Sequence, residues 1–349
     1  MTVGILADMQ RTDGFRMPDG AKIVETTDSA VRMHVTIPTD PEGFLGRQCS
    51  DCSQHFRIDA EDYEALPDDI QLWCVYCGHR ADHGDFLTDQ QRERVMRAVG
   101  DLGVQLVGQA INEAFGGRPS RSSRSGFGIT ISFRAQPFYP QPLPGIDEER
   151  LVRVRQCSGC ALCYAVFGDH RFCPRCGGLP AGLVALDALA AATARLDLLA
   201  QLPGEALPAL REQGVFDRIW ADTLGSLVAA VETLAGAVYR ATVTDAETRL
   251  RGKGNIFQRL DDAADLFAAA GNDDLRTLLD PALWQRLCTA WAIRHVHTHN
   301  DGIVDAKFLT RVPASSARIG QRVGVTEQLC RQAIDDTEEL IRALSGFQP

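Results

Sequence analysis

One arginine and three histidines fall within six consecutive residues near the C-terminus, in the run Arg294-His295-Val296-His297-Thr298-His299. A guanidinium can hold a phosphate through its planar fork of donors, and an imidazole can move protons at neutral pH without a metal. The combination suits chemistry at a phosphodiester. Asn300 and Gly302 follow the run and are residues that end helices, so we expect these side chains at the end of a helix.

A second group of reactive side chains is formed by eight of the eleven cysteines, which occur as four CxxC pairs. Two thiolates of one tight turn can bind one ion, and two such turns complete a tetrahedron with no open position. We therefore expect two structural zinc ions per chain and no catalytic metal, with redox-active thiols as the alternative. The expected ligands are Cys49, Cys52, Cys74 and Cys77 for the first ion and Cys157, Cys160, Cys173 and Cys176 for the second.

Other residues near these motifs have ligand chemistry as well. His55, His79 and His170 could each replace a cysteine, although four cysteines already suffice. Cys163 continues the spacing of the second set, and we expect it to be a spectator.

Hydrophobic periodicity indicates the elements that must position these groups. Alternation of apolar and polar residues predicts strands over residues 31–37 and 129–133. A capping box at Thr88 and Gln91 predicts a helix that runs to about Phe115, and a run rich in glycine, serine and arginine predicts a flexible loop at residues 117–126. We therefore expect two small β zinc ribbons accompanied by flanking strands and one long helix.

Helical periodicity dominates after Pro180. It predicts helices at residues 183–202, 215–242, 255–270, 281–300 and 326–344, with Pro281 at the start of the fourth. The four C-terminal helices imply an antiparallel four-helix bundle, so the predicted class is an α+β multidomain protein. Its predicted parts are an N-terminal segment (1–30), the first zinc ribbon with the long helix (31–116), the flexible loop (117–126), strands with the second zinc ribbon (127–182), a helical linker (183–214) and the helical bundle (215–349).

Composition and charge limit the class of protein. An apolar fraction of 45% is ordinary for a globular chain. No uninterrupted apolar stretch approaches the roughly 20 residues that span a bilayer, and residues 1–8 show no secretory signal, so we expect a cytoplasmic protein without a membrane partner. Residues 1–120 carry 11 basic and 20 acidic side chains and residues 121–214 carry 10 and 8, so the second ribbon suits nucleic acid better than the first.

The spacing of Arg294 and His299 resembles the R-x4-H signature of the HEPN superfamily, many of whose members are metal-independent ribonucleases. Residues 251–260 (RGKGNIFQRL) and 299–305 (HNDGIVD) resemble the segments that flank this signature in bacterial HEPN proteins. The resemblance covers residues 215–349 and implies a helical bundle, which periodicity also predicts.

Arg294 and His299 are five positions apart, so their directions on one ideal helix differ by about 140° and they are not expected to act on the same atom. In HEPN ribonucleases dimerisation brings two copies of the motif to one cleft, which implies a homodimer, or a higher oligomer, with a composite site. The resemblance further implies that Arg294 holds the scissile phosphate of an RNA substrate, that His299 is the general base or acid, and that His295 orients the site.

The reaction implied by the resemblance is attack of the ribose 2′-hydroxyl on the phosphate, which needs no metal, leaves a cyclic phosphate and spares DNA. Toxin and phage-defence roles, with a regulatory protein or antitoxin as partner, are the biological setting that the family implies. The candidate substrate-binding residues are Arg251, Lys253 and Asn300, although Arg251 and Lys253 also suit an ordinary solvated loop. His297 is expected to be a surface residue.

Two other hypotheses for the histidine cluster stay open. His295 and His299 share a helical face, as in a two-histidine metal site, but Val296 stands where HExxH has its glutamate. In the second hypothesis the cluster only caps a helix in a catalytically silent HEPN domain, and the ribbons recognise RNA or protein as a sensor or adaptor.

Overall fold

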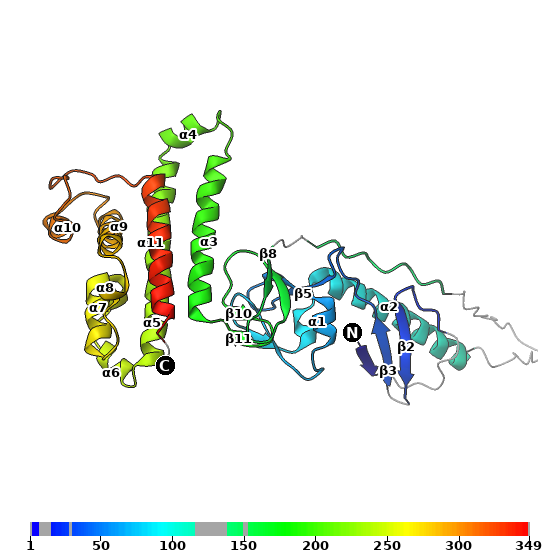
Figure 1. Ribbon diagram of the computed structural model, residues 1–349. Helices are drawn as coiled ribbons and strands as arrows, with labels where there is room; N and C mark the ends of the chain where they lie inside the picture. The colour runs from blue at the N-terminus through cyan, green and yellow to red at the C-terminus, as the bar shows by residue number, and fades with distance from the viewer. Residues whose placement is uncertain (1, 7–14, 28–29, 116–137, 149–152, 348–349) are drawn as a thin grey trace, which may run out of the picture. The chain divides into compact units, whose positions relative to one another are not determined.

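A computed structural model of the chain describes residues 2–6, 15–27, 30–115, 138–148 and 153–347 (Figure 1). The chain divides into two units, one of residues 1–167 and 172–177 and the other of residues 168–171 and 178–349. The first unit contains small sheets and helices, and the second is helical, so the predicted mixed α+β class is confirmed. The predicted loop at 117–126 and the predicted strand at 129–133 lie outside the described residues.

The first unit begins with a three-stranded antiparallel sheet in the order β1-β3-β2, made of β1 (Thr2–Leu6), β2 (Ala21–Thr26) and β3 (Ala30–Val35). Residues 1–30 are therefore not a separate segment, because β1 and β2 both pair with β3. The alternation that predicted β3 reflects burial of one face, since Met33 and Val35 are fully buried. They pack against Val95 and Ala98 of the long helix α2 (Asp89–Phe115).

The predicted capping box at the start of α2 is present. The Gln91 N–H donates to the Thr88 hydroxyl over 3.2 Å, and the Thr88 N–H donates to the Gln91 side chain over 3.4 Å. The two bonds satisfy donors that the first turn of a helix leaves free, which explains why α2 begins here.

The first CxxC of each set lies in one four-stranded antiparallel sheet in the order β4-β5-β9-β8, and the second CxxC of each set lies in a two-stranded sheet, β6-β7 or β10-β11. In the first ribbon the helix α1 (Ala60–Glu64) follows β5, and the 3-10 turn η1 (His83–Phe86) follows β7. Each ribbon thus consists of one longer hairpin and one short hairpin. The strands of the first ribbon are β4 (Phe44–Gln48), β5 (His55–Asp59), β6 (Leu72–Trp73) and β7 (Arg80–Ala81), and those of the second are β8 (Arg153–Gln156), β9 (Cys163–Val166), β10 (Phe172–Cys173) and β11 (Gly177–Gly178).

The two ribbons pair through equivalent residues. Arg57 lies eight positions after Cys49, and Ala165 lies eight positions after Cys157. These two residues stand directly opposite each other where β5 pairs with β9. The pairing of β5 with β9 therefore places equivalent positions of the two ribbons opposite each other.

The short hairpins repeat this symmetry. Trp73 and Phe172 each precede the third cysteine of their set, and their rings stack with centroids 6.1 Å apart and planes 3° apart. The Trp73 N–H donates to the Pro174 carbonyl over 2.8 Å, and the Phe172 N–H donates to the Val75 carbonyl over 3.1 Å. Because such reciprocal contacts define a two-fold interface, the ribbons are related by an approximate two-fold axis within one chain.

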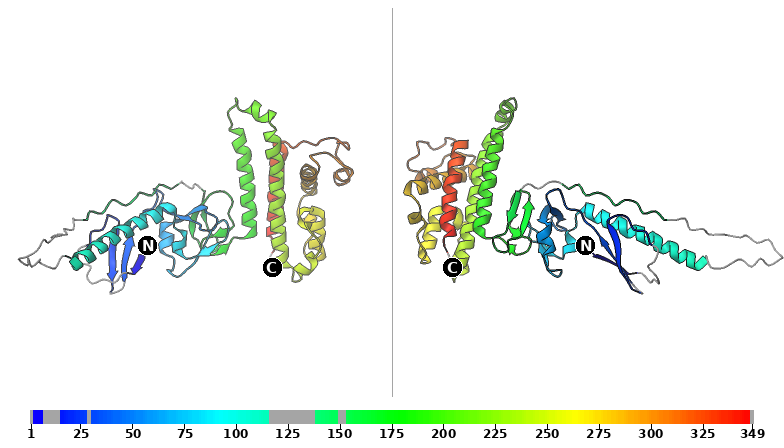
Figure 2. Two further views of the ribbon diagram at one scale, coloured as in Figure 1. Left: turned by 180° about the vertical axis from the view of Figure 1, so that it is seen from behind. Right: turned by 45° about the vertical axis from the view of Figure 1, so that its right-hand side comes forward.

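The second unit is built around the helix α5 (Val215–Thr242). Three long helices pack with it, and α5 and α11 lie between α3 and α9 (Figures 1 and 2). These three are α3 (Ala181–Ala200), α9 (Pro281–His299) and α11 (Glu327–Ser345). Shorter elements complete the unit: α4 (Leu207–Glu212), α6 (Ala246–Leu250), η2 (Ile256–Gln258), α7 (Leu260–Ala269), α8 (Leu275–Leu278) and α10 (Ala306–Arg311).

Two sequence predictions for this unit need correction. Residues 183–214 are not a linker, because Leu189, Ala192 and Leu196 of α3 are at most 4% exposed and belong to the same apolar core as α5. Residues 255–270 do not form one helix, because Arg259 is extended, with φ −116° and ψ 102°, and separates η2 from α7.

Among the described residues, α5 is the one helix whose length and hydropathy would allow it to cross a membrane. Its apolar side chains Leu224, Leu227 and Val231 are at most 2% exposed and pack into the helical core. An apolar stripe that is covered by neighbouring helices is what a core helix of a helical bundle requires.

Candidate functional site

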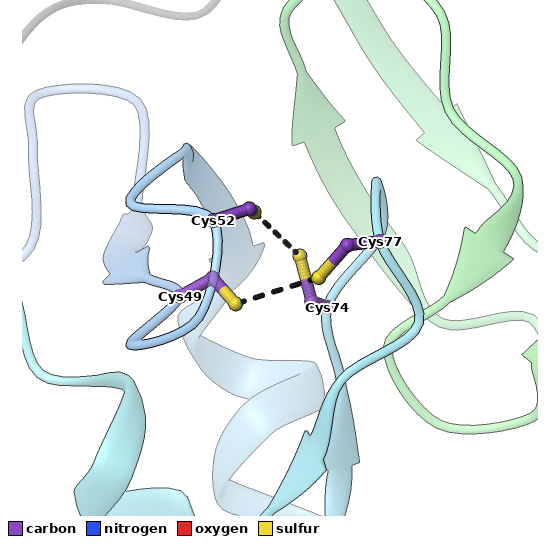
Figure 3. A group of neighbouring side chains, drawn as sticks. All are labelled: Cys49, Cys52, Cys74 and Cys77. Atoms are coloured by element: carbon purple, nitrogen blue, oxygen red, sulfur yellow. Dashed lines mark hydrogen bonds between the residues drawn. The ribbon is translucent and has the colours of Figure 1, made fainter.

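The four cysteines of the first ribbon converge on one point. Cys49 and Cys52 lie on the turn between β4 and β5, and Cys74 and Cys77 lie on the turn between β6 and β7 (Figure 3). The Sγ atoms of Cys49 and Cys77 are 3.7 Å apart, and those of Cys52 and Cys74 are also 3.7 Å apart. All four sulfurs lie within 4.8 Å of one another.

The second ribbon repeats this arrangement, with 3.9 Å between the Sγ atoms of Cys157 and Cys176 and 3.7 Å between those of Cys160 and Cys173. Zinc–thiolate bonds of about 2.3 Å place the sulfurs of a tetrahedron about 3.8 Å apart, whereas a disulfide needs about 2.05 Å. The distances fit tetrahedral four-thiolate sites. The two groups could therefore hold two zinc ions.

Each CxxC turn continues with a residue of left-handed backbone conformation. The φ values are 59° at Ser53, 76° at Gly78, 61° at Ala161 and 82° at Gly177. Glycine adopts this conformation freely, but other residues lose about 1–2 kcal/mol, so Ser53 and Ala161 must be held there by the rest of the turn. One turn geometry therefore recurs four times, as expected if each turn aims two thiolates at one ion.

Cys163 and the neighbouring histidines stand outside both thiol groups. The Cys163 N–H donates to the Asp62 carboxylate over 2.6 Å. Burial, together with the negative charges of Asp59 and Asp62, raises the pKa of the Cys163 thiol. His79 places Nε2 3.4 Å from the Ser50 hydroxyl. Cys163 belongs to neither group of four converging sulfurs.

A pocket of about 310 Å³ in the helical unit brings together Arg294, His295 and His299 of α9. Side chains from three other segments complete its polar wall: Asn255, Gln258 and Arg259 around η2, Asp261 and Asp262 of α7, and Lys307 and Arg311 of α10. The pocket therefore combines the predicted catalytic residues with polar and charged groups from elements that follow and precede them in the chain.

Helical spacing fixes which residues of α9 face this pocket. Trp291, which is 7% exposed, lines the pocket one turn before His295. His295 and His299 lie one turn apart on the same face, with ring centroids 4.8 Å apart, so the predicted shared face is confirmed. The offset of about 140° between Arg294 and His299 does not place them in separate sites, because the pocket wall extends over both directions.

The Arg294 guanidinium keeps free hydrogen-bonding capacity. Its Nη1 lies 3.5 Å from the Gln258 side-chain oxygen, at the limit of a hydrogen bond. Its Nε is buried and has no hydrogen-bond partner within the described part of the chain. A buried donor without a partner is costly, so an anion bound here would gain a charge-assisted bond.

The turn after α9 returns the chain to the pocket. The Asn300 and Gly302 N–H groups both donate to the Val296 carbonyl, and Gly302 adopts φ 77°. A Cβ at Gly302 would lie 2.9 Å from the His297 ring, so only glycine fits. The helix α10 then begins where the Asp305 carboxylate accepts the Phe308 N–H over 2.7 Å.

Lys307 and Arg311 of α10 are functional candidates that the sequence analysis missed. They are four positions apart and therefore share a face of α10. Their spacing after the capping residue Asp305 is the sequence feature that could have indicated a basic helical face. A helix of six residues is, however, too short for hydrophobic periodicity to predict.

The pocket has an excess of positive charge. Four cations, Arg259, Arg294, Lys307 and Arg311, face two carboxylates, Asp261 and Asp262. Arg259 forms an ion pair with Asp262. No other described residue forms an ion pair with Arg294, Lys307 or Arg311, so their charges are available to a ligand.

This positive field acts on His295. Burial lowers the pKa of His295 below its ordinary value, and the charges of Arg311, His299, Lys307 and Arg294 lower it further. Because a lowered pKa favours the uncharged ring, His295 is neutral at neutral pH.

The remaining predicted residues lie elsewhere. Arg251 lines a different hollow, beside Glu247 and Phe257. Lys253 lines neither this hollow nor the pocket at the end of α9. The Asn300 side chain donates to the Ile303 carbonyl over 2.6 Å, so it stabilises the turn. His297 is half-buried rather than a surface residue, because the returning chain places the Val323 carbonyl 2.7 Å from its Nε2.

A two-histidine metal site at His295 and His299 lacks a third protein ligand. Within the described residues, the only groups of three or more metal-ligating side chains close enough to share an ion are the two sets of four cysteines.

Comparisons of the chain with protein-family profiles, with curated proteins and with solved structures find no match.

Loss of one zinc ligand is expected to weaken both metal sites, because the ribbons share the β5–β9 pairing and the contact between Trp73 and Phe172. The parent chain is expected to contain about two zinc ions. In Cys173→Ser the first ribbon is expected to release its ion at about tenfold lower chelator concentration, a typical effect of disturbing the surroundings of a metal site. Metal analysis during a chelator titration measures this, with Cys163→Ser as the control that keeps both ions. Unchanged retention of the first ion would mean that the ribbons are energetically independent.

The His295 ring is expected to titrate below 6.5, and Arg311→Ala is expected to raise its pKa. Removing a positive neighbour stabilises the imidazolium, so the direction of the change is upward. Histidine ring resonances followed by NMR against pH give the value, and Arg318→Ala, an exposed residue outside the pocket, serves as a charge-matched control. A His295 pKa that responds equally to both substitutions would contradict a local effect of α10.

Proposed function

We propose that the chain is a metal-independent endoribonuclease of the HEPN type, with its active site in the pocket at the end of α9. The observation that supports this most directly is that Arg294, His295 and His299 line one pocket in which Arg294, Lys307 and Arg311 have no ion-pair partner among the described residues. The HEPN assignment itself rests on the R-x4-H spacing and its flanking segments. In this proposal α5, α7, α9 and α11 would be the four-helix bundle of that superfamily.

Arg294 would bind the scissile phosphate. Its guanidinium is half-buried in the pocket wall and makes only a 3.5 Å contact with the Gln258 side-chain oxygen, so its donors can turn to a phosphate oxygen. A planar guanidinium can donate two parallel bonds to phosphate and stabilise the negative charge that grows on its oxygens during attack.

His299 would transfer protons, because its ring is exposed at the mouth of the pocket and so can reach a bound strand. As general base it would take the proton of the 2′-hydroxyl while that oxygen bonds to phosphorus. The bond from phosphorus to the 5′-oxygen then breaks, and this oxygen gains a proton. The products are a 2′,3′-cyclic phosphate and a 5′-hydroxyl end. In a homodimer a second copy of the chain would supply the imidazole that donates this second proton.

His295 would position His299 rather than transfer protons. Its ring lies 4.8 Å from that of His299, and its lowered pKa keeps it neutral. A neutral neighbour allows His299 to become an imidazolium during the reaction without repulsion from a second charge.

The ribbons would be structural, because a four-thiolate site leaves no position for a substrate. None of the eleven cysteines forms a disulfide, which suits the reducing cytoplasm that we propose as the compartment. A toxin or phage-defence role, with a regulatory protein or antitoxin that restrains the enzyme, is the setting that fits an RNA-cleaving pocket of this family.

RNA is expected to be cut, and a matched single-stranded DNA spared, by the purified chain in EDTA at a concentration that leaves its zinc content unchanged. Arg294→Ala and His299→Ala are expected to lower the rate about 100-fold or more, the usual scale for loss of a proton-transfer or oxyanion-stabilising group. Gel analysis of end-labelled RNA gives the rate, and enzymatic mapping of the new ends tests for the cyclic phosphate.

Arg318→Ala is the matched control, because it removes an exposed positive charge outside the pocket. Thermal unfolding of each variant shows that the fold is retained. Equal activity of parent, Arg294→Ala and His299→Ala would refute the assignment of these residues. Binding of RNA without cleavage by any form would favour the silent HEPN module that acts as a sensor or adaptor.

A further inference from the structure

Two contacts hold the short helix α10 beside the proposed catalytic residues. The Asp305 carboxylate caps its first turn, and Phe308 is only 3% exposed within the helical core. Phe308 lies between Lys307 and Arg311 in sequence, and both of these basic residues line the pocket. Burial of Phe308 therefore holds the basic face of α10 toward Arg294, His295 and His299.

The charges of Lys307 and Arg311 are not paired within the part of the chain that the structure describes. Several arginines of the helical unit form ion pairs with carboxylates, as Arg249 does with Asp245 and Arg276 does with Asp274. Lys307 and Arg311 have no ion pair with any residue that the structure describes, although each faces a pocket that already contains Arg294. Three unpaired cations on one wall repel one another, so this arrangement is stable only at a cost that a polyanionic ligand would remove.

We propose that Lys307 and Arg311 form a second phosphate subsite beside that of Arg294, so that the pocket binds two phosphates of one polynucleotide strand. The inference rests on the proposed function, because Arg294 is taken to hold the scissile phosphate. It identifies the substrate class as an internal stretch of an RNA strand, since a chain end with one phosphate fills only one of the two positions. Arg311 and Lys307 are binding residues in this scheme and take no part in proton transfer.

The electrostatics of His295 agree with this arrangement. The charges of Arg311 and Lys307 act on the His295 ring and lower its pKa, so both cations are near enough to the reacting groups to matter. Neutralisation of these charges by a bound phosphate would relieve that effect.

The affinities of a nucleoside 3′,5′-bisphosphate and of the matching nucleoside 3′-monophosphate test the subsite, and the readout is their ratio for each variant. Isothermal titration calorimetry on the full chain gives both values. The parent is expected to prefer the bisphosphate by about tenfold, the scale of one charge-assisted hydrogen bond. In Lys307→Ala and in Arg311→Ala the ratio is expected to fall toward one, and Lys307→Arg is expected to restore it.

Two controls separate the subsite from a general effect of charge. Arg318→Ala removes the same charge outside the pocket and is expected to keep the parent ratio. Both α10 positions are exposed at the surface, so their substitution leaves the core intact, which thermal unfolding verifies. With a 2′-O-methyl RNA strand, which cannot be cleaved, the slope of log affinity against log salt is expected to fall by about 0.7 for each of these cations that is removed.

The outcomes distinguish this inference from the proposed function. A parent ratio near one, or a ratio that Lys307→Ala and Arg311→Ala leave unchanged, overturns the second subsite even if the chain cuts RNA. A ratio that depends on Lys307 and Arg311 in a chain that cuts no RNA upholds the subsite and removes the catalytic assignment.

Discussion

The peptide N–H groups of Asn300 and Gly302 donate to one carbonyl, that of Val296, over 2.8 and 2.9 Å, and thereby end α9 directly after His299. The pocket depends on this reversal. It leaves His299 at an exposed helix end while the chain turns back and places α10 along the same wall. His297 holds the returning segment through the Val323 carbonyl, so the histidine that contributes nothing to the pocket wall secures the turn that shapes it. The backbone geometry of this one turn therefore brings the basic residues of α9 and α10 to the same pocket wall.

A different constraint governs the first unit. Its ribbon strands are two to five residues long, and an isolated hairpin of that length is at best marginally stable in water. Two tetrahedral thiol groups and a shared sheet replace the large apolar core that the helical unit has around α5. Because Arg57 pairs with its equivalent Ala165, each ribbon covers the exposed edge of the other. The metal sites and the shared sheet thus stabilise the two ribbons together.

Features encoded by near neighbours could be predicted from the sequence. The CxxC spacing identified all eight thiols of the two groups, and the pattern of Pro281 and Asn300 bounded α9, because turns and helix ends are decided within a few residues. The shared face of His295 and His299 followed from helical geometry alone. The pairing of Arg57 with Ala165 could not be predicted, since a register between distant strands depends on tertiary structure. The place of Lys307 and Arg311 was missed for the related reason that a turn, not a periodic pattern, returns them to the pocket.

The pseudo-symmetric sheet has a consequence for the order of events during synthesis. Tyr164, which pairs with Ile58, is added to the growing chain more than 100 residues after it. At roughly 5–20 residues per second, a ribosome needs about 5–20 s to cover that distance. Throughout this interval β5 has an open edge that can template pairing with other nascent chains. Early capture of zinc by the first four thiols would fix the fold of the first ribbon. The supply of metal during synthesis would therefore influence whether β5 stays unpaired until β9 has been made.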